Sequence, residues 1–333
     1  MNSLPSKTNC KPPRVKSSTR RRRRTAFYLS SALKLAIPGW CFRLRRSGLL
    51  ADLTRDSHPE LFERVDYYCQ LKDTFTPSPE ARRFRDIPIG HPSTYYFDFR
   101  EVFRWFPRDR SVDYQFGDII AVPDSPAFVK SRPIASDGSN ANSILLKWNK
   151  IRHYYFITND QPFSAKQARV VWRGKCGAKP NRLRFLERYI DDPRCDIGDT
   201  DKRSLGTPLN RPFMTIPDQL GFKYIISLEG NDVATNTKWI MSSNSLCLMP
   251  KPRFETWFME GRLKAGEHYV ELADDCADLG DKIDYYEAHP AEAEAIIANA
   301  QAWVDQFRDM RREHLLQLLV VQRYLELSGQ MSA

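Results

Sequence analysis

From residue 166 onward, short apolar runs alternate with amphipathic segments, and this alternation restricts the fold more than any other feature of the sequence. The runs ARVVWRG, FKYIISLEG and SLCLMP have the length and composition of buried strands. The segments KPNRLRFLERYID and DVATNTKWIMSS, which follow the first two runs, are predicted to be helices. Strands that alternate with helices form a parallel sheet with helices on both faces. The sequence therefore predicts an α/β fold for residues 166–289.

Two further segments complete the predicted architecture. Residues 51–165 alternate aromatic-rich runs with Pro, Asp and Ser turns, which indicates a second mixed α/β layer. Within it, ILLKWNKIRHYYFI is predicted to be a helix that runs into a strand. Residues 290–333 begin with Pro and become rich in Leu, Val and Ile, which predicts one long helix over about 290–327. Two α/β units in succession suggest two lobes that face a cleft, with the C-terminal helix packed across both.

The positive charge of the chain belongs to its N-terminal end. The net charge is +10, but residues 1–51 contain thirteen Lys and Arg and no Asp or Glu, so the remainder carries about −3 (+10 minus +13). Residues 1–24 are predicted to be a disordered basic arm. Residues 25–50 combine apolar side chains with arginines, which is typical of an amphipathic helix on an anionic membrane surface. A disordered tail followed by an ordinary core helix explains the same pattern, and both interpretations stay open.

The cysteines and histidines do not form a recognisable binding pattern. Seven Cys and six His are scattered along the chain without C-x-x-C or H-E-x-x-H spacing. This arrangement fits a reducing cytoplasm and argues against a structural metal or a cofactor held by such ligands. No run reaches the roughly 18 apolar residues of a membrane-spanning helix. We therefore expect a cytoplasmic protein that binds no metal.

The loop after the run ARVVWRG has the composition of an anion site. In α/β sheets, ligands lie where strands end and helices begin. Here Gly174 and Gly177 can bring backbone N–H groups close to a phosphate, and a helix begins soon after them. Four basic residues surround the glycines: Arg173, Lys175, Lys179 and Arg182. An ordinary basic turn is the alternative interpretation.

The second candidate loop is SLEGNDVATNTKW, after the run FKYII. Gly230 allows a tight exit from the strand, and four hydrogen-bonding side chains follow it: Asn231, Asp232, Thr235 and Asn236. Capping of the next helix by Asp232 or Asn231 is the commoner use of such residues. Because capping accounts for only one or two of them, the loop is also a candidate ligand site.

Three aspartate motifs are candidates for chemistry. Asp118, in YQFGDII, follows an aromatic strand and a glycine, where a carboxylate can face a cleft with a raised pKa and act as a general base. Asp124, in VPDSP, is the next candidate, and a turn aspartate is the alternative for both. Asp199–Asp201 have the D-x-D form of metal-dependent sugar-nucleotide enzymes. They lie in the polar loop CDIGDTDKRS, however, and are predicted to be solvated.

Taken together, several segments resemble glycosyltransferase family 90, in its branch of bacterial lipopolysaccharide A proteins. The segments occur in the family's order over residues 61–329, and they are FGDIIAVPDSPAFVKSRPI, NSILLKWNKIRHYYFI, VVWRG, KYIISLEGNDVATNTKWIMSSNS, MPKPRFETWFMEG, EHYVEL and DDCADL. The resemblance implies a GT-B architecture, in which two Rossmann-like lobes face a cleft. It also implies an inverting, metal-independent transfer of a hexose from a UDP-sugar to a lipopolysaccharide or lipooligosaccharide core.

The resemblance also assigns roles to residues. Asp118 falls where the family places its general base. Arg173 and Gly174 match the R-G that begins the nucleotide loop, and Arg182 matches the arginine that closes it and contacts diphosphate. The loop that holds the nucleotide-sugar matches the segment that begins at Gly230 and includes Asn231, Asp232, Val233, Ala234, Thr235 and Asn236, with Lys238 shortly after it.

One departure from the family pattern affects the expected chemistry. The eukaryotic branch has an arginine where Asn236 stands, so Lys238, Arg132 or Lys130 is expected to help neutralise the leaving diphosphate. Asp124, Lys130 and Arg132 are therefore possible substrate contacts. The departure also leaves open a relative with impaired catalysis. A nucleic-acid-binding protein that uses its basic arm is a further alternative, against which the near-neutral body and the missing recognition motif argue.

The implied partners are a UDP-sugar, a lipopolysaccharide core and an anionic membrane surface, with no specific nucleic acid. The expected location is the cytoplasmic face of the inner membrane, where the protein is peripheral. The expected organisation is a basic arm (1–24), a membrane-surface segment (25–50), an acceptor-side lobe (51–165), a sugar-nucleotide-binding lobe (166–289) and the C-terminal helix (290–333).

Overall fold

The computed structural model describes residues 22, 25–31, 33, 37–89 and 93–332. Its largest element is a parallel sheet of five strands in the order β12-β10-β9-β7-β8. The strands are β7 (Gln167–Gly174), β8 (Cys195–Asp199), β9 (Phe222–Ile226), β10 (Leu246–Pro250) and β12 (Val270–Leu272). Most of their residues are buried, as expected of a parallel sheet that is covered on both faces. The predicted α/β class is therefore confirmed.

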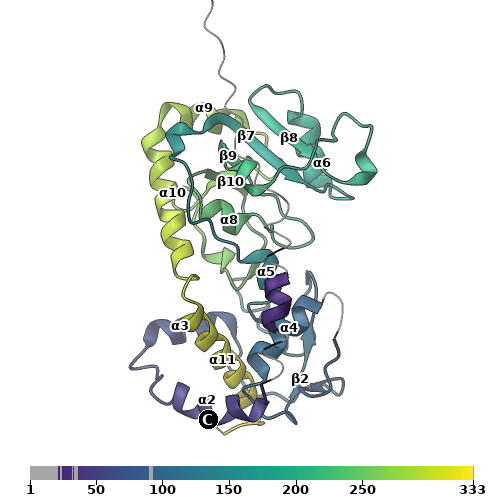
Figure 1. The fold of residues 1–333 in the computed structure, drawn as a ribbon, viewed down its shortest axis with the longest axis vertical. Helices are drawn as coiled ribbons and strands as arrows, with labels where there is room; N and C mark the ends of the chain where they lie inside the picture. Colours follow the sequence, from purple (N-terminus) through teal and green to yellow (C-terminus); the bar gives the residue numbers. More distant parts are fainter. Residues whose placement is uncertain (1–21, 23–24, 32, 34–36, 90–92, 333) are drawn as a thin grey trace, which may run out of the picture.

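The two faces of this sheet belong to two different hydrophobic clusters, because successive side chains of a strand point to opposite sides. On β9, for example, Tyr224 and Ile226 belong to the cluster that includes α6 and α9, whereas Ile225 packs with α8 and α10. The helices of this part are α6 (Pro180–Tyr189), α7 (Ile216–Gln219), α8 (Thr237–Met241), α9 (Leu279–Ala288) and α10 (Pro290–Asp305) (Figure 1). The helix predicted from DVATNTKWIMSS is present, but it begins only at Thr237.

The chain before residue 166 forms a smaller part around a second parallel sheet, in the order β3-β4-β6. This sheet consists of β3 (Tyr114–Gln115), β4 (Ala127–Val129) and β6 (Ser143–Leu145). An antiparallel pair, β1 (Arg82–Arg83) and β2 (Ser111–Val112), forms a separate two-stranded sheet. The helices here are α2 (Gly39–Leu50), α3 (Pro59–Tyr68), α4 (Ser93–Phe103) and α5 (Lys150–His153). Single 3-10 turns occur at Phe163–Ala165, Lys202–Ser204 and Glu260–Arg262.

The segment ILLKWNKIRHYYFI does not fold as predicted. It begins in strand β6 and continues into the short helix α5, so the predicted order of helix and strand was wrong. The chain changes direction at Asn149, whose φ of 54° lies in the left-handed region. After α5, residues 154–157 form neither a helix nor a strand. The turn at Asn149 therefore places α5 at the junction of the two parts (Figure 1).

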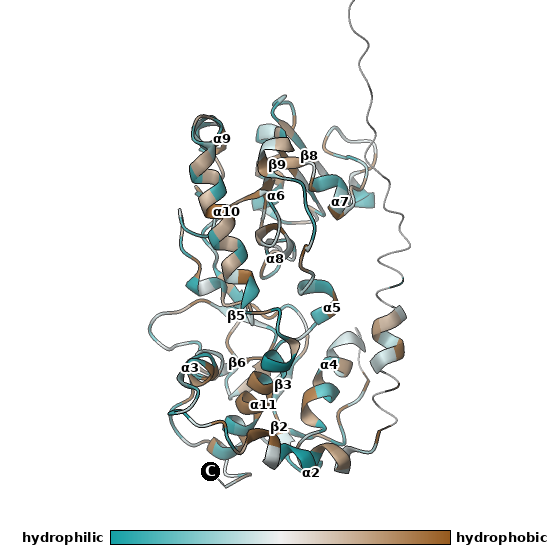
Figure 2. Cartoon of the chain, turned by 60° about the vertical axis from the view of Figure 1, so that its left-hand side comes forward, coloured by the Kyte–Doolittle hydropathy of each residue, from teal (hydrophilic) through white to brown (hydrophobic). Residues whose placement is uncertain are grey.

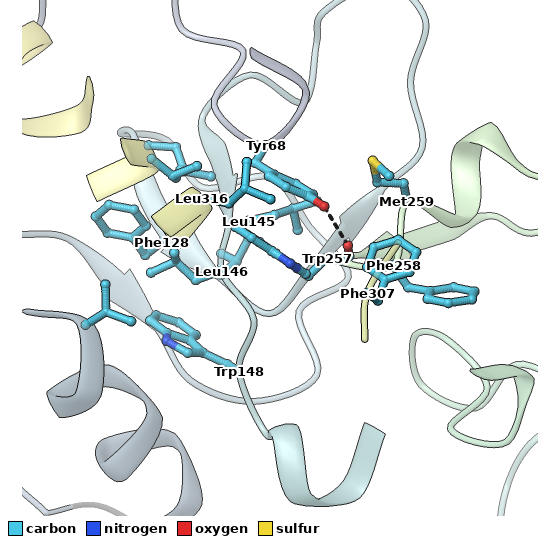
Figure 3. Packing of buried hydrophobic residues seen from close by; sticks show 14 of the residues in the cluster. Tyr68, Phe128, Leu145, Leu146, Trp148, Trp257, Phe258, Met259, Phe307 and Leu316 are labelled. Carbon is cyan, nitrogen blue, oxygen red and sulfur yellow. Dashed lines mark hydrogen bonds between the residues drawn. The ribbon is translucent and has the colours of Figure 1, made fainter. Parts of the chain in front are cut away.

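The smaller part and the large sheet are joined by backbone pairing and by a common core. Strand β5 (Ser131–Pro133) pairs antiparallel with β11 (Phe254–Thr256). Beside this pair, the ring of Tyr68 stacks on Trp257 with centroids 3.7 Å apart, and its hydroxyl donates a hydrogen bond of 2.9 Å to the carbonyl oxygen of Trp257 (Figure 3). The same cluster continues to one face of the five-stranded sheet. The predicted two-lobe GT-B arrangement remains a prediction.

The C-terminal segment contains two helices, α10 and α11 (Met310–Leu327), so the prediction of one long helix was wrong. The side chain of Asp309 accepts hydrogen bonds from the backbone N–H groups of Arg311 and Arg312, at 2.9 and 3.1 Å, and thus starts a new helix. Phe307, between the helices, is fully buried. α10 packs on α8 and β10, whereas the largely apolar α11 packs on α3 and α4 in the smaller part (Figure 2).

Helix α2 combines packed and exposed apolar residues. Phe42 packs edge-to-face on Trp105, with ring centroids 5.1 Å apart. On the other side, Trp40 and Leu44 are 58% and 71% exposed. The helix thus resembles a core helix on one side and a surface-binding helix on the other. The predicted basic arm lies outside the described residues, apart from Arg22. Among the described helices, none has the length and apolar content that a membrane span requires.

Candidate functional site

The order of the five strands predicts where a ligand binds. β7 lies between β8 and β9, so the chain leaves β7 toward one edge of the sheet and later returns to its other side. Crevices at such reversals, at the carboxyl ends of the strands, are the usual ligand sites of α/β sheets. A cavity of about 480 Å³ lies at this position. Its walls are the loops after β7, β8 and β9, together with Asp118, Arg152 and His153 from the smaller part.

The loop after β7 is held in place by Asp199, at the end of β8. One carboxylate oxygen of Asp199 accepts hydrogen bonds from the backbone N–H groups of Cys176 and Asp201, at 3.1 and 2.8 Å. Asp199 and Asp201 are only 5% and 8% exposed, so the prediction that this D-x-D motif is solvated was wrong. The motif instead shapes the loop, because a buried carboxylate is stabilised by the N–H groups that it orders.

Arg182, on α6, joins the two loops of the cavity. Its guanidinium donates hydrogen bonds to the carbonyl oxygens of Lys175 (2.8 Å), Leu228 (2.7 Å) and Glu229 (3.0 Å). A Cβ atom on Gly230 would lie 3.2 Å from this guanidinium, so the glycine permits the close approach. Burial lowers the pKa of Arg182, but arginine remains charged at any pH of interest. No carboxylate pairs with it among the described residues, so its charge is available to an anion in the cavity.

Arg173 also borders the cavity, but its charge is already neutralised. Its guanidinium lies 2.5 Å from the carboxylate of Asp196, on β8. It also donates to the backbone carbonyl oxygens of Asp196 (2.7 Å), Trp172 (3.0 Å) and Pro212 (3.1 Å). These contacts tie β7 to β8 and to the segment around residue 212. The Arg173 guanidinium could contact a ligand only if these bonds were broken.

The polar residues after β9 connect this loop to the smaller part. Asp232 is buried, and its carboxylate lies 2.7 Å from the Lys130 ammonium and accepts a hydrogen bond of 2.6 Å from the Ser131 hydroxyl. Asn231 accepts a hydrogen bond from the Lys179 ammonium and donates one of 3.1 Å to Asp118. Neither residue caps α8, because that helix begins only at Thr237. The capping interpretation of Asp232 and Asn231 was therefore wrong.

Asp118 lies at the cavity wall between two partners. Its carboxylate forms an ion pair with Lys130 and accepts the hydrogen bond from Asn231. Burial acts to raise the pKa of Asp118, but the charge and hydrogen bond of Lys130 and the hydrogen bond from Asn231 outweigh it. The pKa therefore lies below its usual value. The expected raised pKa was wrong, although the position of Asp118 on the cavity agrees with the sequence analysis.

Several predicted site residues do not line this cavity. Lys238 and Arg132 are fully buried in ion pairs with Glu260 (2.6 Å) and Glu255 (2.7 Å), so neither can replace the missing arginine at position 236. Asp124 lies on an exposed loop away from the cavity wall. Asn236 lines the cavity and donates a hydrogen bond of 2.9 Å to the carbonyl oxygen of Ile226.

A second cavity, of about 200 Å³, lies beside the first. The two cavities share Leu228 and Val233, and the predicted residue Ala234 lines only the second one. Most of its other apolar wall comes from the end of β10 and the start of β11, namely Met249, Pro250, Pro252 and Phe254. The loop after β9 therefore separates a basic cavity from a smaller, partly apolar one.

Sequence reasoning missed the contribution of α5, which supplies Arg152 and His153 to the larger cavity. Their only signal was a pair of adjacent basic residues in a segment that was predicted to be helix and strand. With Arg152, the residues that line the cavity include six Lys or Arg (Arg152, Arg173, Lys175, Lys179, Arg182 and Arg203) against three Asp (Asp118, Asp201 and Asp232). Such a cavity favours an anionic ligand.

The described residues contain no cluster of three or more His, Cys, Asp or Glu that could hold a metal ion.

The chain is similar to one protein-family model and to two individual proteins. A family model described as glycosyl transferase family 90 matches residues 140–328, which include both loops of the cavity. The O-glucosyltransferase LpsA of Dichelobacter nodosus is 46% identical over 308 residues, which cover 90% of this chain and 95% of that protein. The uncharacterized protein 035R of invertebrate iridescent virus 3 is 24% identical over 274 residues, which cover 69% of this chain and 24% of that protein.

Proposed function

Because the chain belongs to glycosyltransferase family 90, we propose that it transfers a hexose from a UDP-sugar to a lipopolysaccharide or lipooligosaccharide core, with inversion at the anomeric carbon. One observation carries this proposal. Asp118 from the smaller part and the basic loops of the large sheet meet in one cavity, where Asn231 connects them. The glucosyltransferase relative makes UDP-glucose the first donor to test.

Asp118 is the general base of the proposed reaction. It removes the proton from an acceptor hydroxyl, and the hydroxyl oxygen forms a bond to the anomeric carbon from the face opposite to UDP. The bond between that carbon and the diphosphate oxygen breaks at the same time, and UDP leaves with the electron pair. Because Lys130 pairs with Asp118, the ion pair must loosen or shift toward Asp232 when Asp118 takes the proton.

Arg182 and the neighbouring cations stabilise the negative charge that develops on the diphosphate. Arg182 is fixed by three carbonyl oxygens, so little reorganisation is needed when the charge forms. Lys175 and Arg152 line the same cavity, and Arg152 lies close enough to Asp118 and Arg182 to affect the pKa of both. We assign to Arg152 the compensation for Asn236 that Lys238 and Arg132 cannot provide. These cations take the part of a metal ion, so the reaction is proposed to be metal-independent.

The second cavity is the proposed place of the nucleobase. It adjoins the diphosphate site at Leu228 and Val233, and its apolar wall suits a planar ring. In this arrangement the acceptor approaches from the smaller part, residues 51–165, while residues 166–289 hold the UDP-sugar. The two parts then correspond to the two lobes of a GT-B enzyme.

The proposed location is the cytoplasmic face of the inner membrane. α2 exposes Trp40 and Leu44, and Arg45 is exposed on the same helix. An apolar surface flanked by arginines binds anionic lipid, since burial of the apolar groups and attraction to the headgroups act together. The basic residues of the arm would add to this attraction.

The decisive experiment measures hydrolysis and transfer with a panel of UDP-sugars, using lipopolysaccharide core as the acceptor. We expect UDP release that depends on both donor and acceptor, and a product whose anomeric configuration is opposite to that of the donor. Retention of configuration would exclude the displacement by Asp118. Turnover of none of the UDP-sugars would contradict the proposed donor class.

A further inference from the structure

His153 is a buried side chain of the larger cavity that has no partner in the protein. It lies at the end of α5, is 3% exposed, and lines the cavity together with Asp118 and Asp232. Neither ring nitrogen has a hydrogen-bond partner among the described residues. A buried polar group without a partner is costly, and in native proteins such groups are nearly always paired. The imidazole is therefore suited to bind a group that enters the cavity.

The surroundings of His153 determine what kind of group this is. Burial lowers its pKa well below the usual value, and the neighbouring cations Lys238, Lys130 and Arg152 lower it further. The ring is therefore neutral at physiological pH, with one nitrogen that donates and one that accepts. A phosphate oxygen only accepts hydrogen bonds, so it matches only the nitrogen that carries the proton. Hydroxyl groups both donate and accept, so they match either nitrogen.

The residues around His153 connect it to the proposed base. Two of the cations next to His153, Lys130 and Arg152, are also charge neighbours of Asp118. Lys130, one of these cations, pairs with Asp118 and Asp232. His153 therefore lies toward the end of the cavity where the proposed base is found.

The backbone around His153 is held firmly. Asn149, in the left-handed conformation, sets the start of α5. The N–H group of Lys150 donates a hydrogen bond of 3.0 Å to Asp98, on α4, and the Lys150 ammonium pairs with Glu101. These contacts fix a helix of only four residues at the cavity wall. A rigidly held group is what the selection between similar ligands requires.

We propose that His153 binds a hydroxyl group of the donor sugar and helps to determine which UDP-sugar is used. The inference rests on the proposed function, because it takes the ligand of the cavity to be a UDP-sugar. His153 acts here as a specificity residue and takes no part in the proton transfer that is assigned to Asp118.

The test compares His153→Phe with His153→Gln in the full chain. Phe keeps a ring but removes both nitrogens, whereas Gln keeps one donor and one acceptor. Isothermal calorimetry measures the affinity for UDP, UDP-glucose and UDP-galactose, and a coupled assay measures KM and kcat with each donor. His289→Gln is the control, since His289 lies on the surface at the end of α9. Thermal unfolding of all variants shows whether they are folded.

For His153→Phe we expect the affinity for the preferred UDP-sugar to fall about three- to tenfold, which is the usual range for loss of one hydrogen bond. The affinity for UDP alone should stay within about twofold, and the ratio of kcat/KM between the two donors should change. His153→Gln should recover part of the loss. The control should match the wild type in every measurement.

Two results would overturn the inference. Equal loss of affinity for UDP and for UDP-sugar would show that His153 only supports the structure of the cavity. Unchanged affinity and donor preference in a folded His153→Phe variant would show that the ring does not contact the sugar. In both cases a wild type that binds UDP leaves the proposed function intact. A wild type that binds neither UDP nor a UDP-sugar would instead overturn the proposed function, and this inference with it.

Discussion

Asp118 and Asn231 are 113 residues apart in the sequence and are joined by a hydrogen bond of 3.1 Å between the Asn231 amide nitrogen and the Asp118 carboxylate. The first residue belongs to the smaller part and the second to the loop after β9. Because Asn231 also accepts a hydrogen bond from Lys179, the carboxylate is connected to the basic loop after β7 through one side chain. The proposed base and the proposed diphosphate site are thus oriented relative to each other before any ligand binds.

The first prediction separates the base from the nucleotide site. Asp118→Asn should reduce turnover by about a hundredfold to ten-thousandfold, the usual scale for loss of a general base. UDP affinity should stay near the wild-type value, because the carboxylate faces the acceptor. Calorimetry with UDP and product formation are measured side by side. Asp124→Asn is the matched control, since Asp124 lies on an exposed loop outside the cavity and should behave as the wild type. If Asp118→Asn transferred sugar at the wild-type rate, Asp118 would not be the base and would only be a turn residue.

The second prediction distinguishes the two arginines of the nucleotide loop. Arg182→Ala removes a charge-assisted contact to diphosphate, worth about 1.5–3 kcal/mol, so UDP binding should weaken about tenfold or more. Arg173→Ala should mainly lower the melting temperature, because its guanidinium is bonded to Asp196 and to backbone carbonyl oxygens. The measurements are UDP calorimetry and thermal unfolding of both variants. A larger loss of UDP affinity in Arg173→Ala than in Arg182→Ala would reverse these roles.

The third prediction concerns the D-x-D motif and metal. Activity should survive a chelator, since the charge of the diphosphate is assigned to arginine and lysine. Asp199→Ala should nevertheless weaken UDP binding and lower stability by about 1.5–3 kcal/mol, because the buried N–H groups of Cys176 and Asp201 lose their charged acceptor. Manganese should restore neither property. Recovery of the chelated enzyme by manganese would show that the motif binds a metal after all.

The fourth prediction concerns membrane binding. Deletion of residues 1–24, or the double substitution Trp40→Ser and Leu44→Ser, should release the protein from vesicles that contain anionic lipid. Turnover on a soluble acceptor should persist in both variants. Phe213→Ser is the matched control, because Phe213 is 68% exposed but lies near the large sheet, outside α2. Vesicle flotation is the measurement, and equal binding of all variants would exclude α2 and the arm as the membrane anchor.

The fifth prediction is a pH dependence of stability that originates at Asp98. Burial raises the pKa of this carboxyl to about 6, although Lys150 opposes the shift. The folded state therefore keeps a proton that the unfolded chain releases at lower pH, so Asp98 makes the protein less stable as the pH rises from about 4 to about 6. Relative to Asp98→Asn, the wild type should lose on the order of 3 kcal/mol of unfolding free energy over this interval. Urea unfolding of both proteins at several pH values measures the difference. A difference that does not change with pH would contradict the prediction.

The strands of the large sheet could be predicted because β7, β9 and β10 are nearly continuous apolar runs between polar loops. The break between α10 and α11 could not, because it depends on Asp309 accepting two backbone hydrogen bonds within an otherwise helical pattern. The segment around Asn149 was mistaken for a helix because its apolar residues suit a buried strand equally well.

Only part of the candidate site could be predicted from the sequence. Its two loops could be predicted because glycines and polar residues follow strands at the carboxyl edge of a parallel sheet. The sequence does not predict that Arg182, and not Arg173, is available to a ligand. This depends on the pairing of β7 with β8, which places Arg173 next to Asp196. Arg152 and His153 were missed because α5 reaches the cavity only through contacts between distant parts of the chain.

The pairing of β5 with β11, together with the stack of Tyr68 on Trp257, limits how the two parts can move relative to each other. Sliding would break a ladder of three paired residues and an aromatic stack, whereas a rotation about the ladder preserves both. Lys130 directly precedes β5, so the cluster of Lys130, Asp118 and Asp232 lies beside this pivot. The loop after β7 is not part of that cluster. A hinge rotation that moves the smaller part away from the loop after β7 would therefore have to break the Asn231–Asp118 hydrogen bond, whereas the ion pairs of Lys130 lie beside the pivot and would persist.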